Sequence, residues 1–270
     1  MMPHGQLKKT VLKRFTRFRL HRALFILPNA FTMASIFCGT YAILHTVLYS
    51  GPEALYHSAI AVFFAGFFDM FDGRVARLTK TQSEFGMEFD SLADVVSFGV
   101  APAVIVYRWA LWHLGPLGMV VAICFTACGA IRLARFNVLA RRPSPSGDYF
   151  VGLPIPIAAS MLVALVVAHF RLFEGLPVTR HISIITLVLL LSFLMVSTVS
   201  FWTFKSVKFG RKTIYISFIA AISLFVAGLM IPVSLILVAI IGSYIALGIA
   251  RELYLLITGS SGRSSGQARG

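Results

Sequence analysis

Charged residues are scarce in this 270-residue chain, since Asp, Glu, Lys and Arg together make up only 13% of it. An average soluble domain carries about 25% charged residues. Hydrophobic residues account for 58% of the chain, and a soluble protein of this length cannot cover that much apolar surface. The composition therefore favours one polytopic membrane domain over soluble domains.

Cysteine is also scarce. The three cysteines, Cys38, Cys124 and Cys128, each fall inside an apolar run. Cys124 and Cys128 share a helix face, but no further Cys or His completes a zinc-binding set. The sequence therefore predicts neither a disulfide framework nor a zinc site.

Basic residues, by contrast, are plentiful, and the net charge is +14. In a membrane protein such an excess marks cytoplasmic loops and contact with anionic lipid, and eight membrane-length apolar runs exclude a basic nucleic-acid-binding protein. Residues 1–26 combine this charge with Val11, Leu12, Phe15 and Phe18 at helical spacing. We expect a basic amphipathic juxtamembrane helix there, with a disordered basic tail as the alternative.

The rest of the chain is dominated by long apolar segments, most of which approach the ~20 residues that cross a bilayer. Eight are recognised, at approximately 28–49, 54–72, 92–113, 115–138, 151–170, 181–203, 213–231 and 233–257. The fold class expected is an all-α polytopic bundle of about eight transmembrane helices, over residues 27–257. The Gly, Ser and Arg-rich residues 258–270 are expected to form a disordered cytoplasmic tail.

The basic residues test this helix count. With the N-terminus in the cytoplasm and eight crossings, only Arg108, Arg171 and Arg180 of the 24 Lys and Arg fall toward the outer side. A wrong count would scramble this bias, so the positive-inside rule supports eight crossings with both termini inside.

Acidic residues are the scarcest charged type, and their placement is uneven. Six of the ten lie within 26 positions, near the inner ends of the second and third crossings: Asp69, Asp72, Glu84, Glu88, Asp90 and Asp94. Carboxylates at membrane depth are costly and usually functional. Glu84 and Glu88 are interpreted as solvated loop charges. The paired spacing of the four aspartates, by contrast, requires a functional explanation.

The spacing of the aspartates predicts a metal site. Asp69 and Asp72 are three residues apart and Asp90 and Asp94 four apart, so each pair shares one helix face. The two helices are expected to run antiparallel, which lets the pairs face each other. Four clustered carboxylates repel one another unless cations lie between them, and ligands that are all oxygen favour Mg²⁺, Mn²⁺ or Ca²⁺ over zinc.

Small and cationic residues flank the aspartates. Gly73 follows Asp72, and Gly86 precedes Asp90 by four residues. Small residues let a backbone or a ligand phosphate approach closely. Arg77 lies at the predicted cytoplasmic edge and is a natural partner for a phosphate.

These residues match a family signature. The sequence reads Asp69-x-x-Asp72-Gly73-x-x-Ala76-Arg77, then eight residues, then Gly86-x-x-x-Asp90-x-x-x-Asp94. This run resembles the full pattern of the CDP-alcohol phosphotransferases, without departure in type or spacing. The stretches 91–102, 132–137 and 150–154 further resemble the members that make phosphatidylserine, and the likeness spans roughly residues 27–156.

The resemblance implies a reaction and its reactants. Enzymes of this family displace CMP from a CDP-linked lipid with an alcohol. Here the resemblance implies CDP-diacylglycerol as the donor and L-serine as the acceptor, with phosphatidylserine and CMP as the products. It also implies two divalent cations, Mg²⁺ or Mn²⁺, with Ca²⁺ as a non-productive occupant.

The resemblance also assigns roles to residues. Asp69, Asp72 and Asp90 are expected to hold the metal ions, and Asp94 to accept the proton of the serine hydroxyl and also touch a metal. The sequence alone does not separate base from ligand among the four. The residues expected to bind the CDP-lipid are Asn29, Thr32, Gly73, Arg77 and Gly86.

The serine carboxylate calls for a cation in the pocket. Arg132 and Arg135 lie three residues apart on the inner half of the fourth crossing, and a guanidinium can grip a carboxylate with two hydrogen bonds. The alternative is that both arginines anchor the helix by extending to the interface.

Two other functions remain open at this point. A sister enzyme would use glycerol 3-phosphate, inositol or choline as the acceptor. An ion-coupled transporter would also place acids in the membrane, although these acids leave no relay across the outer half. The family resemblance further implies a homodimer, and a bacterial inner (plasma) membrane with the active site at its cytoplasmic face.

Overall fold

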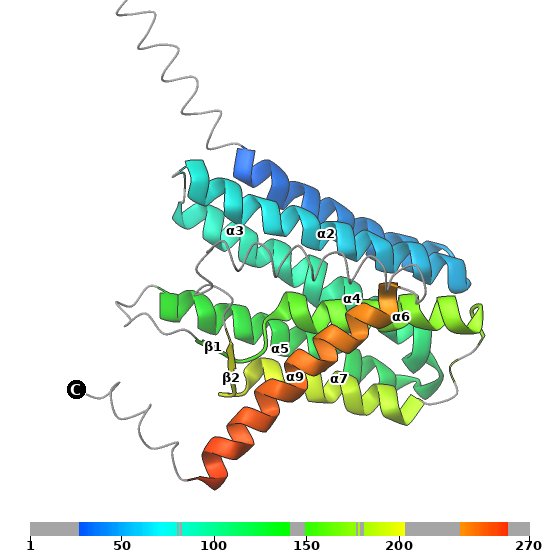
Figure 1. Ribbon diagram of the computed structural model, residues 1–270. Helices are drawn as coiled ribbons and strands as arrows, with labels where there is room; N and C mark the ends of the chain where they lie inside the picture. The colour runs from blue at the N-terminus through cyan, green and yellow to red at the C-terminus, as the bar shows by residue number, and fades with distance from the viewer. Residues whose placement is uncertain are drawn as a thin grey trace, which may run out of the picture.

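The computed structural model describes most of the chain, namely residues 27–79, 81, 83–140, 149–176, 178, 181–202 and 233–258. Nearly all of these residues are helical (Figure 1). Three predicted features lie outside the described residues: the juxtamembrane helix at 1–26, the seventh apolar segment at 213–231, and the tail beyond residue 258.

Six described helices are long and apolar enough to cross a membrane. They are Leu27–Leu48, Pro52–Thr79 (α2), Glu84–Leu114, Pro116–Leu139 (in α5, Pro116–Ala140), Ile155–Phe173 (α6) and Val233–Leu255 (in α9, Val233–Ile257). These six coincide with six of the eight predicted segments. The all-α polytopic prediction is therefore confirmed for the part of the chain that the structure describes.

The sixth predicted segment, 181–203, is shorter as a helix. Helix α7 is His181–Val196, and its 16 residues span ~24 Å, less than the ~30 Å of a hydrocarbon core. The chain leaves the helix at Ser197 and forms strand β2, Ser200–Trp202, which pairs antiparallel with β1, Tyr149–Val151. The hydrophobic pattern misses this small sheet because each three-residue strand merely extends an apolar run.

The third crossing is not a uniform α-helix. Its parts are α3 (Glu84–Asp94), a π-helical segment (Val95–Val100), α4 (Ala101–Val106), a second π-helical segment (Tyr107–Leu111) and a 3₁₀ turn (Trp112–Leu114). The first π-helical segment begins directly after Asp94. Such widened turns are frequent at functional sites because they change the direction in which neighbouring side chains point.

The helices pack around a buried apolar core. Helix α5 packs against α7, and α6 packs against both α2 and α9. Phe98, Phe125, Leu162 and Leu191 are almost fully buried between these helices. The first helix, α2 and α3 lie side by side and project beyond this core (Figure 1), which places the acidic ends of α2 and α3 next to each other.

Gly39 fixes how closely the first helix approaches the third crossing. A Cβ atom at Gly39 would lie 2.6 Å from Ser97 Oγ and 2.7 Å from Ser97 Cα. Ser97 also donates a hydrogen bond of 3.0 Å to the carbonyl oxygen of Ser35. No side chain fits at position 39 without separating the two backbones.

We therefore expect Gly39→Ala to destabilise the fold by ~1–3 kcal/mol, the usual cost of overpacking. Gly66→Ala is the matched control, because a Cβ there meets only the Phe98 ring at an ordinary 3.6 Å. Thermal unfolding of both variants in the same detergent checks this. Equal melting temperatures for Gly39→Ala and the wild type would contradict the proposed close approach.

Candidate active site

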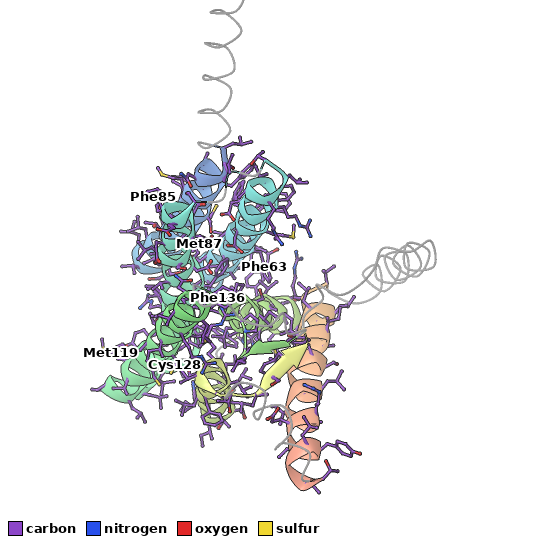
Figure 2. The ribbon with its side chains drawn as sticks, turned by 90° about the vertical axis from the view of Figure 1, so that its left-hand side faces the viewer. Phe63, Phe85, Met87, Met119, Cys128 and Phe136 are labelled. Atoms are coloured by element: carbon purple, nitrogen blue, oxygen red, sulfur yellow. The ribbon has the colours of Figure 1, made fainter. Side chains whose placement is uncertain are left out.

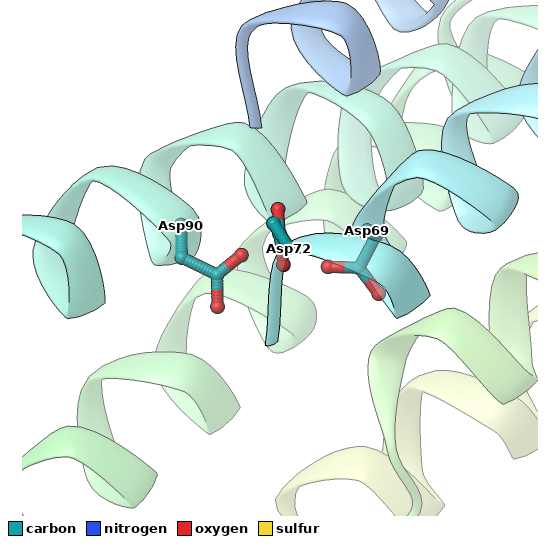
Figure 3. A group of neighbouring side chains, drawn as sticks. All are labelled: Asp69, Asp72 and Asp90. Atoms are coloured by element: carbon teal, nitrogen blue, oxygen red, sulfur yellow. The ribbon is translucent and has the colours of Figure 1, made fainter. Parts of the chain in front are cut away.

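Three of the predicted metal ligands come together. Asp69 and Asp72 project from α2 and Asp90 from α3, as Figure 3 shows. One carboxylate oxygen from each residue lies within 4.8 Å of the others. The cluster forms because α2 and α3 pass antiparallel, so that both acidic faces meet.

The fourth aspartate borders this cluster. Asp94 is only 8% exposed, and its carboxyl group lies within hydrogen-bonding reach of Asp69 and near Asp90. One oxygen each of Asp90 and Asp94 is buried without a hydrogen-bond partner. Buried carboxylate oxygens without partners are costly, so the residues fit a site that is completed by cations.

The donor set also fits hard divalent cations. Every candidate ligand atom is a carboxylate oxygen, the ligand type that suits Mg²⁺, Mn²⁺ and Ca²⁺. Mg²⁺ in particular is usually held by a few carboxylates together with substrate phosphates and water.

The first helix supports the cluster from one side. The buried Thr32 hydroxyl donates to Asp72 Oδ2 at 2.9 Å and lies 3.2 Å from the carbonyl oxygen of Pro28. Asn29 Oδ1 lies near Gly86, where an added Cβ would be 3.7 Å away from it. Thr32 therefore orients a candidate ligand, and Asn29 faces the start of α3.

The predicted phosphate-binding residues lie at the ends of α2 and α3. Arg77 Nε donates to the Gly73 carbonyl oxygen at 2.8 Å, one turn back on the same helix. The backbone N–H of Gly86 donates to Ser83 Oγ at 3.0 Å, which makes Ser83 the N-cap of α3. Arg77 remains exposed at the helix end, where its guanidinium can still reach an anion.

A pocket lined by four charged side chains as well as apolar ones, here called the polar pocket, adjoins the aspartates on the Asp94 side. Its volume is about 280 Å³, and Met87 of α3 and Phe136 of α5 mark two of its walls (Figure 2). The lining residues are Met87, Glu88, Asp90, Ser91, Asp94, Arg132, Leu133, Phe136, Asn137, Pro154 and Pro156. Asp90 and Asp94 thus belong both to the carboxylate cluster and to this pocket.

The two arginines predicted to bind the acceptor are placed differently. Arg132 is 8% exposed, lines the pocket, interacts electrostatically with Asp94 and lies over the Phe136 ring. Arg135 does not line it. Its guanidinium donates to the carbonyl oxygens of Val196, Val151 and Ser197 at 2.9–3.0 Å.

Arg135 therefore ties α5 to the end of α7 and to the segment before α6. Val196 and Ser197 present carbonyl groups that the end of α7 leaves without helical partners. Gly152, at φ +83°, lets Arg135 approach, since a Cβ there would lie 3.0 Å from its Nη2. The same segment continues into Pro154 and Pro156, which form a wall of the pocket.

Three polar residues of the pocket, Glu88, Ser91 and Asn137, were not predicted as site residues. Asn137 Nδ2 donates to Ser91 Oγ at 2.9 Å and to Glu88 Oε2 at 3.3 Å, linking α5 to α3. Glu88 and Ser91 are three residues apart, on the face that also carries Asp94. That spacing is the one sequence signal that points to them, whereas Asn137 needs the packing of α5 on α3.

Comparisons with known proteins agree with this site. The sequence model of the CDP-alcohol phosphatidyltransferase family matches residues 25–185, which include every candidate ligand and the whole polar pocket.

Individual relatives carry a more specific name. A Helicobacter pylori protein named CDP-diacylglycerol–serine O-phosphatidyltransferase is 38% identical over 87% of this chain and 94% of its own length. A Bacillus subtilis protein of the same name is 38% identical over 66% of this chain and 91% of its own length. One from Methanocaldococcus jannaschii is 40% identical over 53% of this chain and 61% of its own length.

Proposed function

Because the chain belongs to the CDP-alcohol phosphatidyltransferase family, we propose that it transfers the phosphatidyl group of CDP-diacylglycerol to the hydroxyl of L-serine. The products are phosphatidylserine and CMP. One observation supports this most strongly: Asp94 lies between a three-carboxylate cluster and a polar pocket that holds a buried arginine. The names of the relatives favour serine over glycerol 3-phosphate, inositol or choline, and an enzyme over an ion-coupled transporter.

Asp94 is the general base in this proposal. Its carboxylate accepts the proton of the serine hydroxyl as the serine oxygen bonds to the phosphorus that carries diacylglycerol. The bond from that phosphorus to the CMP oxygen breaks, and CMP leaves with the bonding electron pair. Asp94 suits this role because it faces the pocket, whereas Asp69 and Asp72 do not line it.

Asp69, Asp72 and Asp90 hold the divalent cations, with Asp94 at the edge of the set. When bound, Mg²⁺ or Mn²⁺ supplies positive charge that neutralises the pyrophosphate of the donor and stabilises the departing CMP. Ca²⁺ also suits oxygen ligands, but we assign it as a non-productive occupant. Thr32 holds the Asp72 carboxylate in place through its hydrogen bond.

The CDP group of the donor lies over the ends of the first helix, α2 and α3. Gly73 and Gly86 leave room for the pyrophosphate, and Arg77 pairs with one of its phosphates. Asn29 and Thr32 approach the same space from the first helix.

The polar pocket receives serine. Arg132 pairs with the serine carboxylate, while Glu88 and Asn137 supply an anion and an amide for the serine ammonium group. Glycerol 3-phosphate has no ammonium group, and its phosphate would face Glu88 unfavourably, so this pocket suits a zwitterion better.

We further propose that the aspartates and both chain ends lie at the cytoplasmic face of a bacterial inner membrane, an orientation that the positive-inside bias supports. Six long apolar helices in the described part of the chain make this a multi-pass membrane protein. CDP-diacylglycerol then reaches the site from the inner leaflet and serine from the cytoplasm. We further propose a homodimer, as the family resemblance implies.

Arg132 and Arg135 should differ in kinetics. Arg132→Gln is expected to raise the KM for serine ~10- to 100-fold, corresponding to a charged hydrogen bond of ~1.5–3 kcal/mol, with little change in the KM for CDP-diacylglycerol. Arg135→Lys replaces the two spread Nη donors with one compact ammonium group, which does not reach the same three carbonyl groups in the same geometry. It is therefore expected to lower kcat and the melting temperature together. Steady-state kinetics with each substrate varied in turn, and thermal unfolding, check both. A selective rise in serine KM for Arg135→Lys alone would reverse the two assignments.

Competition between acceptors tests the choice of serine. Purified protein in detergent is given CDP-diacylglycerol, Mn²⁺ and labelled L-serine, with unlabelled L-serine, glycerol 3-phosphate, inositol or choline in excess. The proposal predicts that only unlabelled L-serine reduces labelled lipid strongly. Efficient CMP release with another alcohol, and none with serine, would keep the family and replace the acceptor.

A further inference from the structure

Helix α9 lies outside the residues that the family model matches, 25–185, yet it packs against α6, which lies within them. It crosses α6 obliquely (Figure 1). Gly242 lies beside Met161, where an added Cβ would be 3.9 Å from Met161 Cε. Tyr244 stacks on Phe201 with ring centroids 5.7 Å apart. Through these contacts α9 packs against α6 and β2.

A second cavity lies where α9 meets α2 and α6. Its volume is about 370 Å³, and Phe63 lies on the side of α2 that borders it (Figure 2). The lining residues are Val62, Phe63, Gly66, Asp69, Met70, Phe98, Pro156, Ile157, Ser160, Val163 and Ile241. Ile241 is the contribution of α9.

This cavity has fewer charged side chains in its walls than the polar pocket has. Among the described residues that line it, Asp69 is the one charged group and Ser160 the one hydroxyl. Pro156 lines both spaces, so the start of α6 separates them. Among the described residues, the carboxylate cluster therefore borders a space with four charged side chains on its Asp94 side and a space with one, Asp69 itself, on its other side.

We infer that the apolar cavity holds an acyl chain of the CDP-linked lipid donor, and that Ile241 of α9 helps to set which chains fit. This inference rests on the proposed function. Two features favour an acyl chain as the occupant: the cavity is continuous with Asp69, where the pyrophosphate of the donor must lie, and its walls are apolar along α2, α6 and α9. A space lined mainly by apolar side chains can accept a hydrocarbon chain while the donor's polar end stays at the aspartates.

The inference assigns α9 a role in substrate selection. The adjacent residue Ile240 does not line the cavity and is 51% exposed. Substitution at 241 should therefore change donor selection, whereas the same substitution at 240 should not. This contrast separates an effect on the cavity from a general effect of a larger side chain on α9.

The test compares Ile241→Phe with Ile240→Phe, using CDP-dioleoylglycerol and CDP-dihexanoylglycerol as donors and serine as acceptor. Ile241→Phe is expected to lower kcat/KM for the dioleoyl donor ~10-fold or more, as steric discrimination in an apolar pocket allows, with a much smaller effect on the dihexanoyl donor. Ile240→Phe is expected to match the wild type with both. A wild type that releases no CMP would overturn the proposed function, which is a separate result.

Labelling provides a second measurement on the unsubstituted protein. A CDP-diacylglycerol with a photoactivatable diazirine in one acyl chain should label peptides of α6 and α9 that contain Ile157, Ser160 or Ile241, and excess unlabelled donor should suppress this. Equal loss of activity with both donors in Ile241→Phe, or labelling confined to other surfaces, would overturn the inference. Labelling that unlabelled donor does not suppress would assign the cavity to a structural membrane lipid instead.

Discussion

Asp94→Asn is expected to lower kcat for phosphatidylserine formation by ~10²–10⁴-fold, the range that general base catalysis supplies. Asparagine keeps the shape of the side chain but cannot accept the serine proton. Asp94 is 8% exposed, and its carboxyl group borders both the carboxylate cluster and the polar pocket. Among the described carboxylates, only Asp90 has the same access. CMP release from the purified variant at saturating substrate measures the effect.

Two controls make this result specific. Glu53→Gln removes a carboxylate at the opposite end of α2 and should leave kcat unchanged. Binding of Mn²⁺ to Asp94→Asn should fall far less than its turnover, because Asp69, Asp72 and Asp90 remain. Turnover within about twofold of wild type would contradict the assignment of Asp94 as base, since general base catalysis contributes at least ~10²-fold.

Asp72→Asn is expected to lower metal affinity most, whereas Asp94→Asn is expected to lower turnover and largely keep metal binding. Asp72 is one of three residues whose oxygens lie within 4.8 Å of one another, and Thr32 orients it. Outer-shell substitutions already cost ~10–100-fold in metal affinity, so loss of a direct ligand should cost at least ~100-fold. Titration with Mn²⁺, followed by electron paramagnetic resonance, measures this directly.

Raising the metal concentration separates the two variants. Activity of Asp72→Asn should recover in part at high Mn²⁺, because the remaining carboxylates still bind weakly. Activity of Asp94→Asn should not recover, because its defect lies in proton transfer. Wild-type Mn²⁺ affinity in Asp72→Asn would remove Asp72 from the ligand set.

Much of the site follows from spacing alone. The intervals between Asp69 and Asp72, and between Asp90 and Asp94, put each pair on one helix face, and a short linker makes the two helices antiparallel. The structure confirms that Asp69, Asp72 and Asp90 meet. Local periodicity is sufficient here because neighbouring segments supply all the groups.

Features that depend on distant segments were not predictable in this way. Arg135 lies three residues from Arg132, and spacing alone treats the two alike. They differ because the end of α7, 61 residues later, presents the Val196 carbonyl group to Arg135. The contact of Asn137 with Ser91 likewise requires α5 to pack on α3.

The fold likewise has features that the local sequence predicts and features that depend on packing between distant segments. Apolar length predicts the six long helices, because each must satisfy its own backbone hydrogen bonds in lipid. The early end of α7 at Val196 is not visible in hydropathy, since the apolar run continues into β2. Which helix borders which substrate space, as α9 does at Ile241, is set only by tertiary packing.

The proposed transfer of the phosphatidyl group to serine is tested most directly by the stoichiometry of the two products. Purified protein in detergent is incubated with CDP-diacylglycerol, labelled L-serine and Mg²⁺ or Mn²⁺, with EDTA added to a parallel sample. The proposed reaction yields CMP and labelled phosphatidylserine in equal amounts, and neither product with EDTA. CMP release without labelled lipid, or no release of CMP with any alcohol from folded protein, would contradict it.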